Sequence, residues 1–442
     1  KKNHYTIEEV TLCGETVRFR AFRDLVYVEK PVNVEFQKMN LFVPESYYEG
    51  TSINGYDLLS APVFMPNTVG GYMPGPADEP GANPFLQGKP NTIFRALQHG
   101  YVVASPAIRG RVQKGEDGHY NGKAPACVVD YKAAVRYLHF LADELPGDEN
   151  KIITNGTSAG GALSSLMGST GNHPDYEPYL QALGAADAGD DVFEFCSVND
   201  FHRANMKMDE GGRPVFTPVD GEMTEEQIRV SVEEKALFPA YVSSLGLKDE
   251  NGAPLTLDAD GEGSLKEYVK HIVMESAQRA LDGGVDLADK TWLTIENGKV
   301  QSMDFAAYVK DITRMKTAPA FDALDLESPE NDLFGNEMTN CRHFTEYSAA
   351  NTKVQGERAE KKIVKMLNPM EYVMDEMAQK AHHFRIRHGE CDRDTSLVIS
   401  AMLVLKLREA GCEVDYHSPW NTPHAGDYDL DELFAWIDGI CG

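Results

Sequence analysis

The chain is poor in basic residues and in long hydrophobic runs. Its 442 residues carry 42 Lys and Arg against 69 Asp and Glu, a net charge of −27. Such an acidic excess argues against a partner held by phosphate contacts. The longest apolar run, near Val398 to Leu405, ends at Lys406 and is far shorter than the roughly 20 residues of a membrane span. The sequence therefore predicts a soluble globular protein with neither a nucleic-acid nor a membrane partner.

Several common cofactor and metal motifs are also missing. The seven cysteines include no CxxC pair, and the chain contains no GxGxxG, no GxxxxGK[ST] and no HExxH. The usual sequence motifs for binding zinc, dinucleotides and nucleoside triphosphates are therefore absent. We expect neither a cofactor nor a metal. An odd number of cysteines slightly favours a reducing, cytoplasmic compartment. Because the chain begins without Met, an export leader removed beforehand is an open alternative.

Turn residues and apolar patterns divide the chain into two kinds of structure. The first 60 residues contain short β segments separated by Pro and Gly, as in hairpins. From Ala61 onward strands and helices alternate, which is typical of a mostly parallel sheet flanked by helices. The β segments are Val17 to Phe22, Leu25 to Val28 and Lys38 to Val43. The alternating elements are strands at Pro62 to Met65, Tyr101 to Ala104, Lys151 to Thr154 and Val192 to Ser197, with helices at Cys127 to Leu145 and from Ser158.

The alternation stops between about residues 203 and 367. This stretch holds acidic helical segments and one hairpin signal, Asn297-Gly298, a pair that suits a type I′ turn. The core pattern returns with Asn368-Pro369, an expected helix start, and continues through Phe384 to Arg387, Ser396 to Ala410 and Glu413 to His417. We therefore predict an α/β core from residues 1–202 and 368–442 with a large inserted lid domain, 203–367.

One motif carries nucleophilic chemistry. Gly156-Thr157-Ser158-Ala159-Gly160 matches the GxSxG elbow, in which a strained turn between strand and helix lifts the serine above the sheet of an α/β-hydrolase fold. The motif alone is weak evidence. Its context supports it, because a predicted strand precedes the serine and a helix of small residues follows.

A serine hydroxyl needs a histidine to remove its proton and an acid to orient that histidine, and in this fold both follow late strands. Asp392 and Asp394 follow the strand at 384–387, and position favours Asp392 as the acid, since Asp394 could cap the next helix. His424 follows the last strand on a loop. His388 and His417 lie at strand ends, where structural roles are more common.

An oxyanion hole needs two N–H donors. One is expected from the backbone of Ala159, directly after the nucleophile, and the other from the loop after the strand at 62–65. That loop contains Gly70-Gly71, and the sequence does not decide which of the two glycines donates or whether the pair is purely conformational.

Three stretches resemble a known family of serine esterases. They are Met65 to Gly75, Asn155 to Leu163 and Asp392-Arg393-Asp394, and they are similar to the bacterial tannases, which release gallic acid from galloyl esters. The resemblance runs from Tyr27 to Trp436 and includes the lid. It implies a catalytic triad at Ser158, Asp392 and His424.

The resemblance also implies a site for the ring hydroxyls of the galloyl group. The matching positions are Lys316 and Glu330 in the lid and Asp394 in the core. Sequence patterns alone would have taken the two lid residues for solvated charges. Phenolic hydroxyls are donors and carboxylates are acceptors, so the residue types fit. The substrate expected is a small aromatic ester.

Two other enzyme classes remain as alternatives. A feruloyl esterase or general carboxylesterase shares the triad but needs no polar clamp for the ring. A serine peptidase of the same fold would need a site for a substrate amine or terminus, and the sequence shows none. The oligomeric state and the alcohol part of the substrate are left open.

Overall fold

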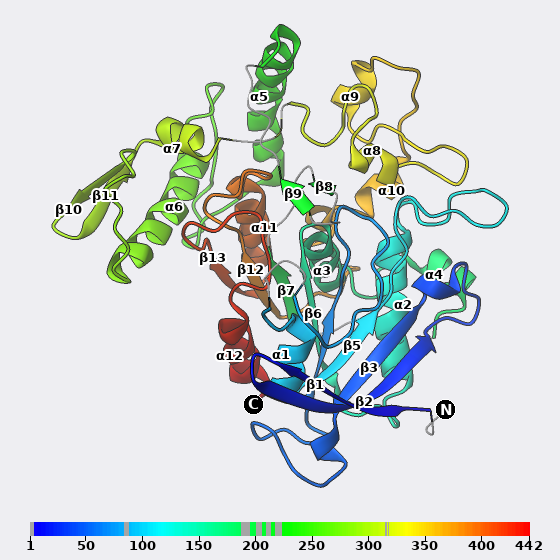
Figure 1. The fold of residues 1–442 in the computed structure, drawn as a ribbon. Coiled ribbons are helices and arrows are strands. Elements are labelled where there is room, and N and C mark those ends of the chain that lie inside the picture. Colours follow the sequence, from blue (N-terminus) through cyan, green and yellow to red (C-terminus); the bar gives the residue numbers. More distant parts are fainter. Residues whose placement is uncertain are drawn as a thin grey trace.

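A nine-stranded mixed sheet forms the centre of the molecule. The computed structural model describes residues 4–83, 88–186, 195–199, 206–208, 214–216, 223–313, 316 and 318–442. Within these residues the strand order is β1-β2-β3-β5-β4-β6-β7-β12-β13, and Figure 1 shows the sheet running from the first strands to β12 and β13 at the opposite edge. The strands are β1 Thr6–Leu12, β2 Glu15–Val26, β3 Lys38–Pro44, β4 Pro62–Pro66, β5 Val102–Pro106, β6 Asp148–Thr157, β7 Phe195–Asn199, β12 His383–Arg387 and β13 Glu413–His417.

The first three strands form the antiparallel edge that the sequence predicts. β1 and β2 are joined by Cys13-Gly14, both with positive φ (53° and 80°), as a type I′ hairpin requires. The strand β1 was not expected. The predicted segment 17–22 and the first half of the predicted segment 25–28 are instead one strand, β2, which ends at Val26. A bulge between Phe22 and Leu25 lets its pairing with β3 continue.

The remaining strands are parallel to one another and carry the helices. Strands β4 and β5, and residues 152–156 of β6, are buried throughout, as expected for a parallel sheet covered on both faces. Helices α1 and α12 contact each other, and α2 contacts α3 and α4. The α/β-hydrolase fold predicted from the sequence is confirmed. The helices are α1 Thr92–His99, α2 Ala126–Phe140, α3 Ala159–Ser169, α4 Glu177–Leu183, α11 Leu397–Glu409 and α12 Leu430–Cys441.

Two helix predictions need correction. The helix expected to reach Leu145 ends at Phe140, and continuing it would place Asp143 and Glu144 at the negative end of the helix dipole, where carboxylates are unfavourable. The helix expected after Asn368 is a single 3₁₀ turn, Pro369–Glu371, capped by the Asn368 side chain.

Most of the segment between β7 and β12 lies above the carboxyl ends of the parallel strands (Figure 1). Its hairpin, β10 and β11, turns at Asn297-Gly298 with φ of 50° and 73°, as predicted. The predicted boundary at residue 203 lies outside the described residues. The elements are β8 Met206–Met208, β9 Pro214–Phe216, α5 Glu225–Leu245, α6 Ser264–Asp282, β10 Leu293–Glu296, β11 Lys299–Met303, α7 Phe305–Ile312, α8 Pro329–Leu333, α9 Glu346–Ala350 and α10 Lys361–Lys365.

Helix α11 joins this segment to the sheet. Leu403, Val404 and Leu407 belong to the main hydrophobic core. Ala401 packs in a cluster with α6 and α7, and Leu405 packs in a cluster with α5 and α6. A helix that is apolar on all sides is a buried one, and α11 is buried because the inserted segment covers the side that the sheet does not.

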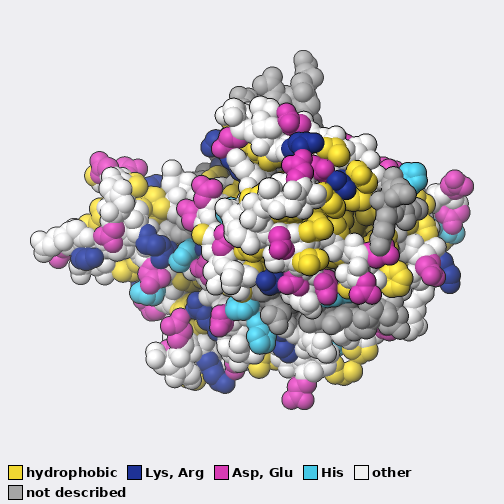
Figure 2. Space-filling view, turned by 90° about the horizontal axis from the view of Figure 1, so that it is seen from below, with side chains coloured by type: hydrophobic (Ala, Val, Ile, Leu, Met, Phe, Trp, Pro, Cys, Tyr) yellow, Lys and Arg dark blue, Asp and Glu magenta, His cyan; other side chains and the backbone are white. Residues whose placement is uncertain are grey.

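The face of the molecule drawn in Figure 2 carries charges of both signs. On the face drawn in Figure 2, acidic side chains are spread among neutral atoms, with Lys and Arg singly or in small groups between them. No helix in the described part of the chain is long and apolar enough to cross a membrane.

Candidate active site

Ser158 occupies a strained turn between β6 and α3. Its φ and ψ are 61° and −126°, a conformation that non-glycine residues rarely adopt. The flanking glycines are sterically required. A Cβ on Gly156 would lie 2.2 Å from the carbonyl oxygen of Gly160, and a Cβ on Gly160 would lie 2.5 Å from the Asn67 side-chain oxygen. The turn therefore has the geometry of a nucleophile elbow, with the serine at the carboxyl edge of the sheet.

The loop after β4 lies directly against this elbow. The Asn67 side-chain amide donates to the carbonyl oxygens of Asn155 (3.0 Å) and Gly160 (3.1 Å). Its own side-chain oxygen accepts the N–H of Val69 at 3.2 Å. Asn67 therefore holds the loop and the elbow in one arrangement. Sequence patterns did not select this residue, although its place between a strand end and a Gly-Gly pair was a usable signal.

The Gly-Gly pair begins a tight turn. The N–H of Met73 donates to the carbonyl oxygen of Gly70 at 3.0 Å, and Gly71 and Tyr72 have φ of 54° and 56°, as in a type I′ turn. The positive φ at Gly71 favours glycine there, although Tyr72 adopts a similar φ in the same turn. Within the described residues, the N–H groups of Gly70 and Gly71 donate no hydrogen bond to protein atoms.

Asp392 is held by three donors. Its Oδ2 accepts from His424 Nδ1 at 3.0 Å, and its Oδ1 accepts the backbone N–H of Asp394 (2.7 Å) and Thr395 (3.2 Å). Burial of the carboxyl, which is 3% exposed, opposes its ionisation. The His424 hydrogen bond and the charges of His388 and His424 outweigh burial and hold the pKa of Asp392 below its usual value. Asp392 is therefore an ionised partner for His424.

The other two histidines considered from sequence have different surroundings. His388 is buried, with Nε2 3.7 Å from Asp392 Oδ2 and Nδ1 3.1 Å from the Ser400 hydroxyl. His417 Nε2 lies 3.5 Å from Asp415 Oδ1 at the end of β13. Of the three, His424 is the one that hydrogen-bonds Asp392.

The loop that carries His424 packs on the strand end that precedes Ser158. A Cβ on Gly426 would lie 1.9 Å from Thr157 Oγ1, and a Cβ on Gly389 would lie 2.2 Å from the carbonyl oxygen of Thr422. These close approaches place the loop of His424 against both the Asp392 loop and the elbow.

Lys316, Glu330 and Asp394 form a largely buried charged group beside this pair. Lys316 Nζ lies 3.5 Å from Asp394 Oδ1, and Glu330, in the first turn of α8, is 7% exposed. Burial lowers the pKa of Lys316, and the charges of Asp394 and Glu330 oppose that shift. Burial raises the pKa of Asp394, although His424 and Lys316 favour its charged form. The charge of Lys316 thus acts on a carboxylate of the core, and the charge of Glu330 acts on Lys316.

The same region could also present ligand atoms to a cation. The ligating atoms of Asp392, Asp394 and His424 lie within 4.8 Å of one another. The Lys316 ammonium, 3.5 Å from Asp394, would repel a cation placed there.

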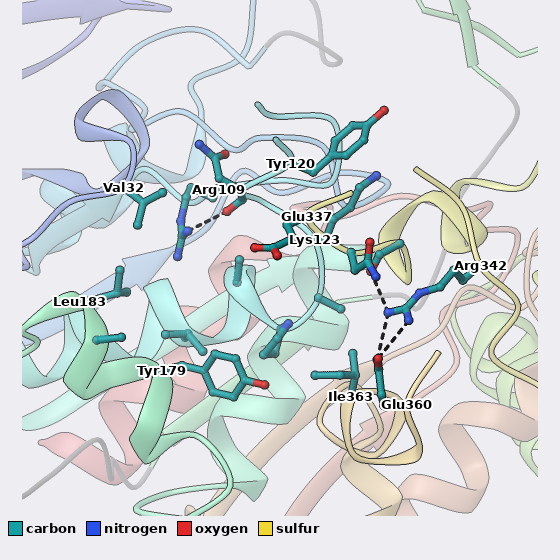
Figure 3. A pocket seen from close by; sticks show the side chains of 18 residues that line it. Val32, Arg109, Tyr120, Lys123, Tyr179, Leu183, Glu337, Arg342, Glu360 and Ile363 are labelled. Carbon is teal, nitrogen blue, oxygen red and sulfur yellow. Dashed lines mark hydrogen bonds and ion pairs between the residues drawn. The ribbon is translucent and has the colours of Figure 1, made fainter. Parts of the chain in front are cut away.

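A hollow of about 470 Å³ lies away from these residues, between the loop after β5, α4 and the chain after α8. Figure 3 shows Arg342 paired with Glu360 in its wall. Arg109 and Lys123 are likewise paired, with Asp130 and Asp332. These three cations of the wall are thus already neutralised by carboxylates. The strained serine and the Asp392–His424 pair are better evidence for the reacting centre than this space is.

Comparisons with known proteins give consistent results. The BD-FAE family model, an esterase family of the α/β-hydrolase type, matches residues 83–224. Esterase LipC from Mycobacterium tuberculosis is 35% identical over 88 residues, which is 20% of this chain and 22% of LipC. This chain therefore spans about a fifth of that curated relative.

Solved structures match over the whole chain. Tannase from Lactobacillus plantarum is 41% identical, with a TM-score of 0.95, and the match covers 99% of this chain and 98% of that one. Tannase from Fusobacterium nucleatum is 40% identical, with a TM-score of 0.93 and coverage of 100% and 99%. A tannin acyl hydrolase in complex with ethyl gallate is 41% identical, with a TM-score of 0.91 and coverage of 99% and 97%.

Proposed function

The chain belongs to the tannase family of α/β-hydrolase-fold serine esterases, and we propose that it hydrolyses galloyl esters through an acyl-enzyme on Ser158. The observation that carries the residue assignment is the placement of two aspartates of one turn. Asp392 faces His424, whereas Asp394 faces Lys316. One turn therefore supports both the proton transfer and the binding of a polar ring.

In the proposed first step, His424 acts as general base. Its Nδ1–H donates to Asp392, which leaves the Nε2 lone pair to accept the Ser158 proton. The serine Oγ forms a bond to the ester carbonyl carbon, whose π electrons move to oxygen. When the tetrahedral intermediate collapses, the C–O bond to the alcohol breaks and the alcohol leaves with the proton from His424.

Hydrolysis of the acyl-enzyme repeats the same chemistry with water. His424 removes a proton from water as the water oxygen attacks the acyl carbon, and it then protonates the departing Ser158 Oγ. The free acid is released and the serine is restored. Asp392 stabilises the imidazolium in both steps without itself accepting the proton.

The oxyanion is assigned to backbone donors. The N–H of Ala159 lies at the N-terminus of α3, where the helix dipole favours negative charge. The second donor is assigned to Gly70 or Gly71, whose N–H groups are not used by other described residues. The Asn67 hydrogen bonds to the elbow support this assignment, because they fix the position of the glycine loop relative to Ala159.

The ring hydroxyls are assigned to Lys316, Glu330 and Asp394. Carboxylates accept hydrogen bonds from phenols, and an ammonium favours a partly ionised phenol oxygen. The first two residues come from the inserted segment and the third comes from the core. We therefore also propose that residues 203–367 act as the lid over the core of 1–202 and 368–442, closing the ring site.

The test is a series of methyl benzoates that differ only in ring hydroxyls. A site built for hydrogen bonds can reject an analogue without them by about 10⁴-fold, because its buried charges are left unpaired. We expect kcat/KM to fall from methyl gallate to methyl protocatechuate and to be barely measurable for methyl benzoate. Glu330→Gln should flatten the series.

The matched control is Glu337→Gln, an exposed glutamate a few positions further along the same segment, which should leave the series unchanged. If methyl ferulate or p-nitrophenyl butyrate equals methyl gallate in kcat/KM, the ring clamp does not operate and a general esterase is the better description.

A further inference from the structure

Helix α8, which carries Glu330, has only five residues, too few to be stable alone. Its position must therefore come from tertiary contacts. On one side Asn331, which is fully buried, bonds within the inserted segment, to Asp322 at 2.6 Å and to the Arg342 carbonyl oxygen at 3.1 Å. On the other side Asp332 faces the core.

Asp332 is bound by two core cations. Arg111 and Lys123, both from the loop between β5 and α2, pair with its carboxylate. Lys123 Nζ also donates to the Asp332 carbonyl oxygen at 2.8 Å and to Asn340 at 2.9 Å. The side chains of Arg111, Lys123 and Asp332 are 12%, 4% and 10% exposed. Lys123 lies close to the Tyr120 ring in the wall of the hollow in Figure 3.

Arg111 has a second partner in the oxyanion loop. Its Nε donates to the carbonyl oxygen of Gly71 at 2.9 Å, and its backbone N–H donates to the carbonyl oxygen of Tyr72 at 2.9 Å. One guanidinium therefore joins the loop expected to bind the oxyanion to the helix expected to bind the ring. A guanidinium carries its donors on separate nitrogens and can therefore reach two sites at once, whereas all three donors of a lysine lie on a single nitrogen.

We propose that Arg111 is a positioning residue that sets the spacing between the oxyanion loop at Gly71 and the ring-binding Glu330, acting through Asp332. The inference rests on the proposed function, because the spacing matters only for an ester whose carbonyl and ring hydroxyls are bound together. The substrate's own length then has to match the distance that the bridge fixes.

The oxyanion loop keeps its local shape without this bridge. Its turn is closed by the Met73–Gly70 hydrogen bond, and Asn67 ties it to the elbow. An ester without ring hydroxyls should therefore be cleaved nearly as well when the Arg111 side chain is shortened. This separates a positioning role from a general loss of structure.

The experiment compares methyl gallate with p-nitrophenyl acetate in Arg111→Met and Asp332→Asn. Misplacement by about 1 Å can cost about 10²-fold, so we expect kcat/KM for methyl gallate to fall by about 30- to 100-fold, mainly through KM. The rate on p-nitrophenyl acetate should change by less than about 3-fold. Arg111→Lys keeps the charge and should lose the same selectivity with less loss of thermal stability.

The matched control is Arg136→Met, which removes another buried arginine, paired with Glu177 in the core. It should lower the melting temperature without changing the ratio of the two rates. Combining Arg111→Met with Glu330→Gln should be no worse on methyl gallate than Glu330→Gln alone, because Arg111 acts through Glu330. Multiplicative losses would overturn the inference, since independent effects add in free energy.

The positioning role and the proposed function fail differently. If Glu330→Gln lowers the methyl gallate rate but the Arg111 and Asp332 variants lower both rates equally, only the positioning role is wrong. If the unmodified protein and Glu330→Gln treat the two esters alike, the proposed function is wrong, and the positioning role falls with it.

Discussion

Replacing Glu390 by glutamine should change how the stability of the protein depends on pH. Glu390 lies two residues before Asp392 and is 5% exposed. One carboxylate oxygen accepts the N–H of Asn421 at 3.3 Å, and its backbone carbonyl accepts the Tyr308 hydroxyl at 2.7 Å. Burial raises the pKa of Glu390 from 4.5 to about 7, although the Asn421 hydrogen bond and the charge of Lys290 oppose the shift.

The direction follows from proton linkage. The folded protein holds this proton more tightly than the unfolded chain, whose glutamate titrates near 4.5. Protonated Glu390 therefore stabilises the fold below about pH 4.5, and this contribution is lost as the pH rises through about 7. A pKa difference of about 2.5 units corresponds to about 3 kcal/mol.

Glutamine keeps an acceptor for Asn421 and cannot ionise. Relative to the unmodified protein, Glu390→Gln should gain about 2.5 kcal/mol between pH 5 and pH 8, or a melting-temperature difference of about 3 °C for a chain of this length. Thermal unfolding followed by circular dichroism at half-unit pH steps measures this. The exposed Glu376 provides the control variant, Glu376→Gln. Parallel curves for Glu390→Gln and the unmodified protein would refute the reasoning.

Three further predictions concern the reacting groups. Ser158→Ala should lower kcat on the order of 10⁴-fold with the fold intact, and mass spectrometry should find a fluorophosphonate adduct on Ser158; labelling of another serine would contradict the assignment. Asp392→Asn should lower kcat on every ester by about 10³- to 10⁴-fold because His424 loses its tautomer partner, whereas Asp394→Asn should lower rates on hydroxylated aromatic esters alone; equal losses on an aliphatic ester would reverse the two roles. Gly426→Ala should lower kcat by about 10²-fold, since its Cβ would lie 1.9 Å from Thr157 Oγ1, just before Ser158. Gly439→Ala has open space around it and should leave kcat unchanged.

Local rules made much of the site predictable. The elbow at Ser158 could be predicted from sequence because a serine flanked by glycines, between a strand and a helix, is characteristic of this strained turn. The Asn297-Gly298 turn was predicted for a similar reason, since two successive positive φ angles favour those residues. The order of Asp392 and His424 followed from chain order in the fold. The first two of these inferences depend on a few neighbouring residues, and the third depends on the chain order that the fold imposes.

Family resemblance supplied what local patterns could not. Lys316 and Glu330 sit in a segment whose sequence reads as solvated charge, and nothing in their neighbours shows that both side chains are at least partly buried. Their roles were inferred from the tannase resemblance and stay a prediction. The structure adds that Lys316 lies 3.5 Å from Asp394, an approach between residues that are distant along the chain.

Tertiary structure alone decided the connections between these parts. Arg111 and Asp332 are 221 positions apart, and Asn67 reaches Gly160 across 93 positions. Which ion pair forms depends on how the inserted segment packs on the core, and no periodicity or turn signal encodes that. Sequence determined the turns, the elbow at Ser158 and the fold, because backbone sterics and apolar periodicity act locally. The spacing between the proposed reacting centre and the proposed ring site came only from packing, since charges that are far apart in sequence become neighbours only when the core has formed.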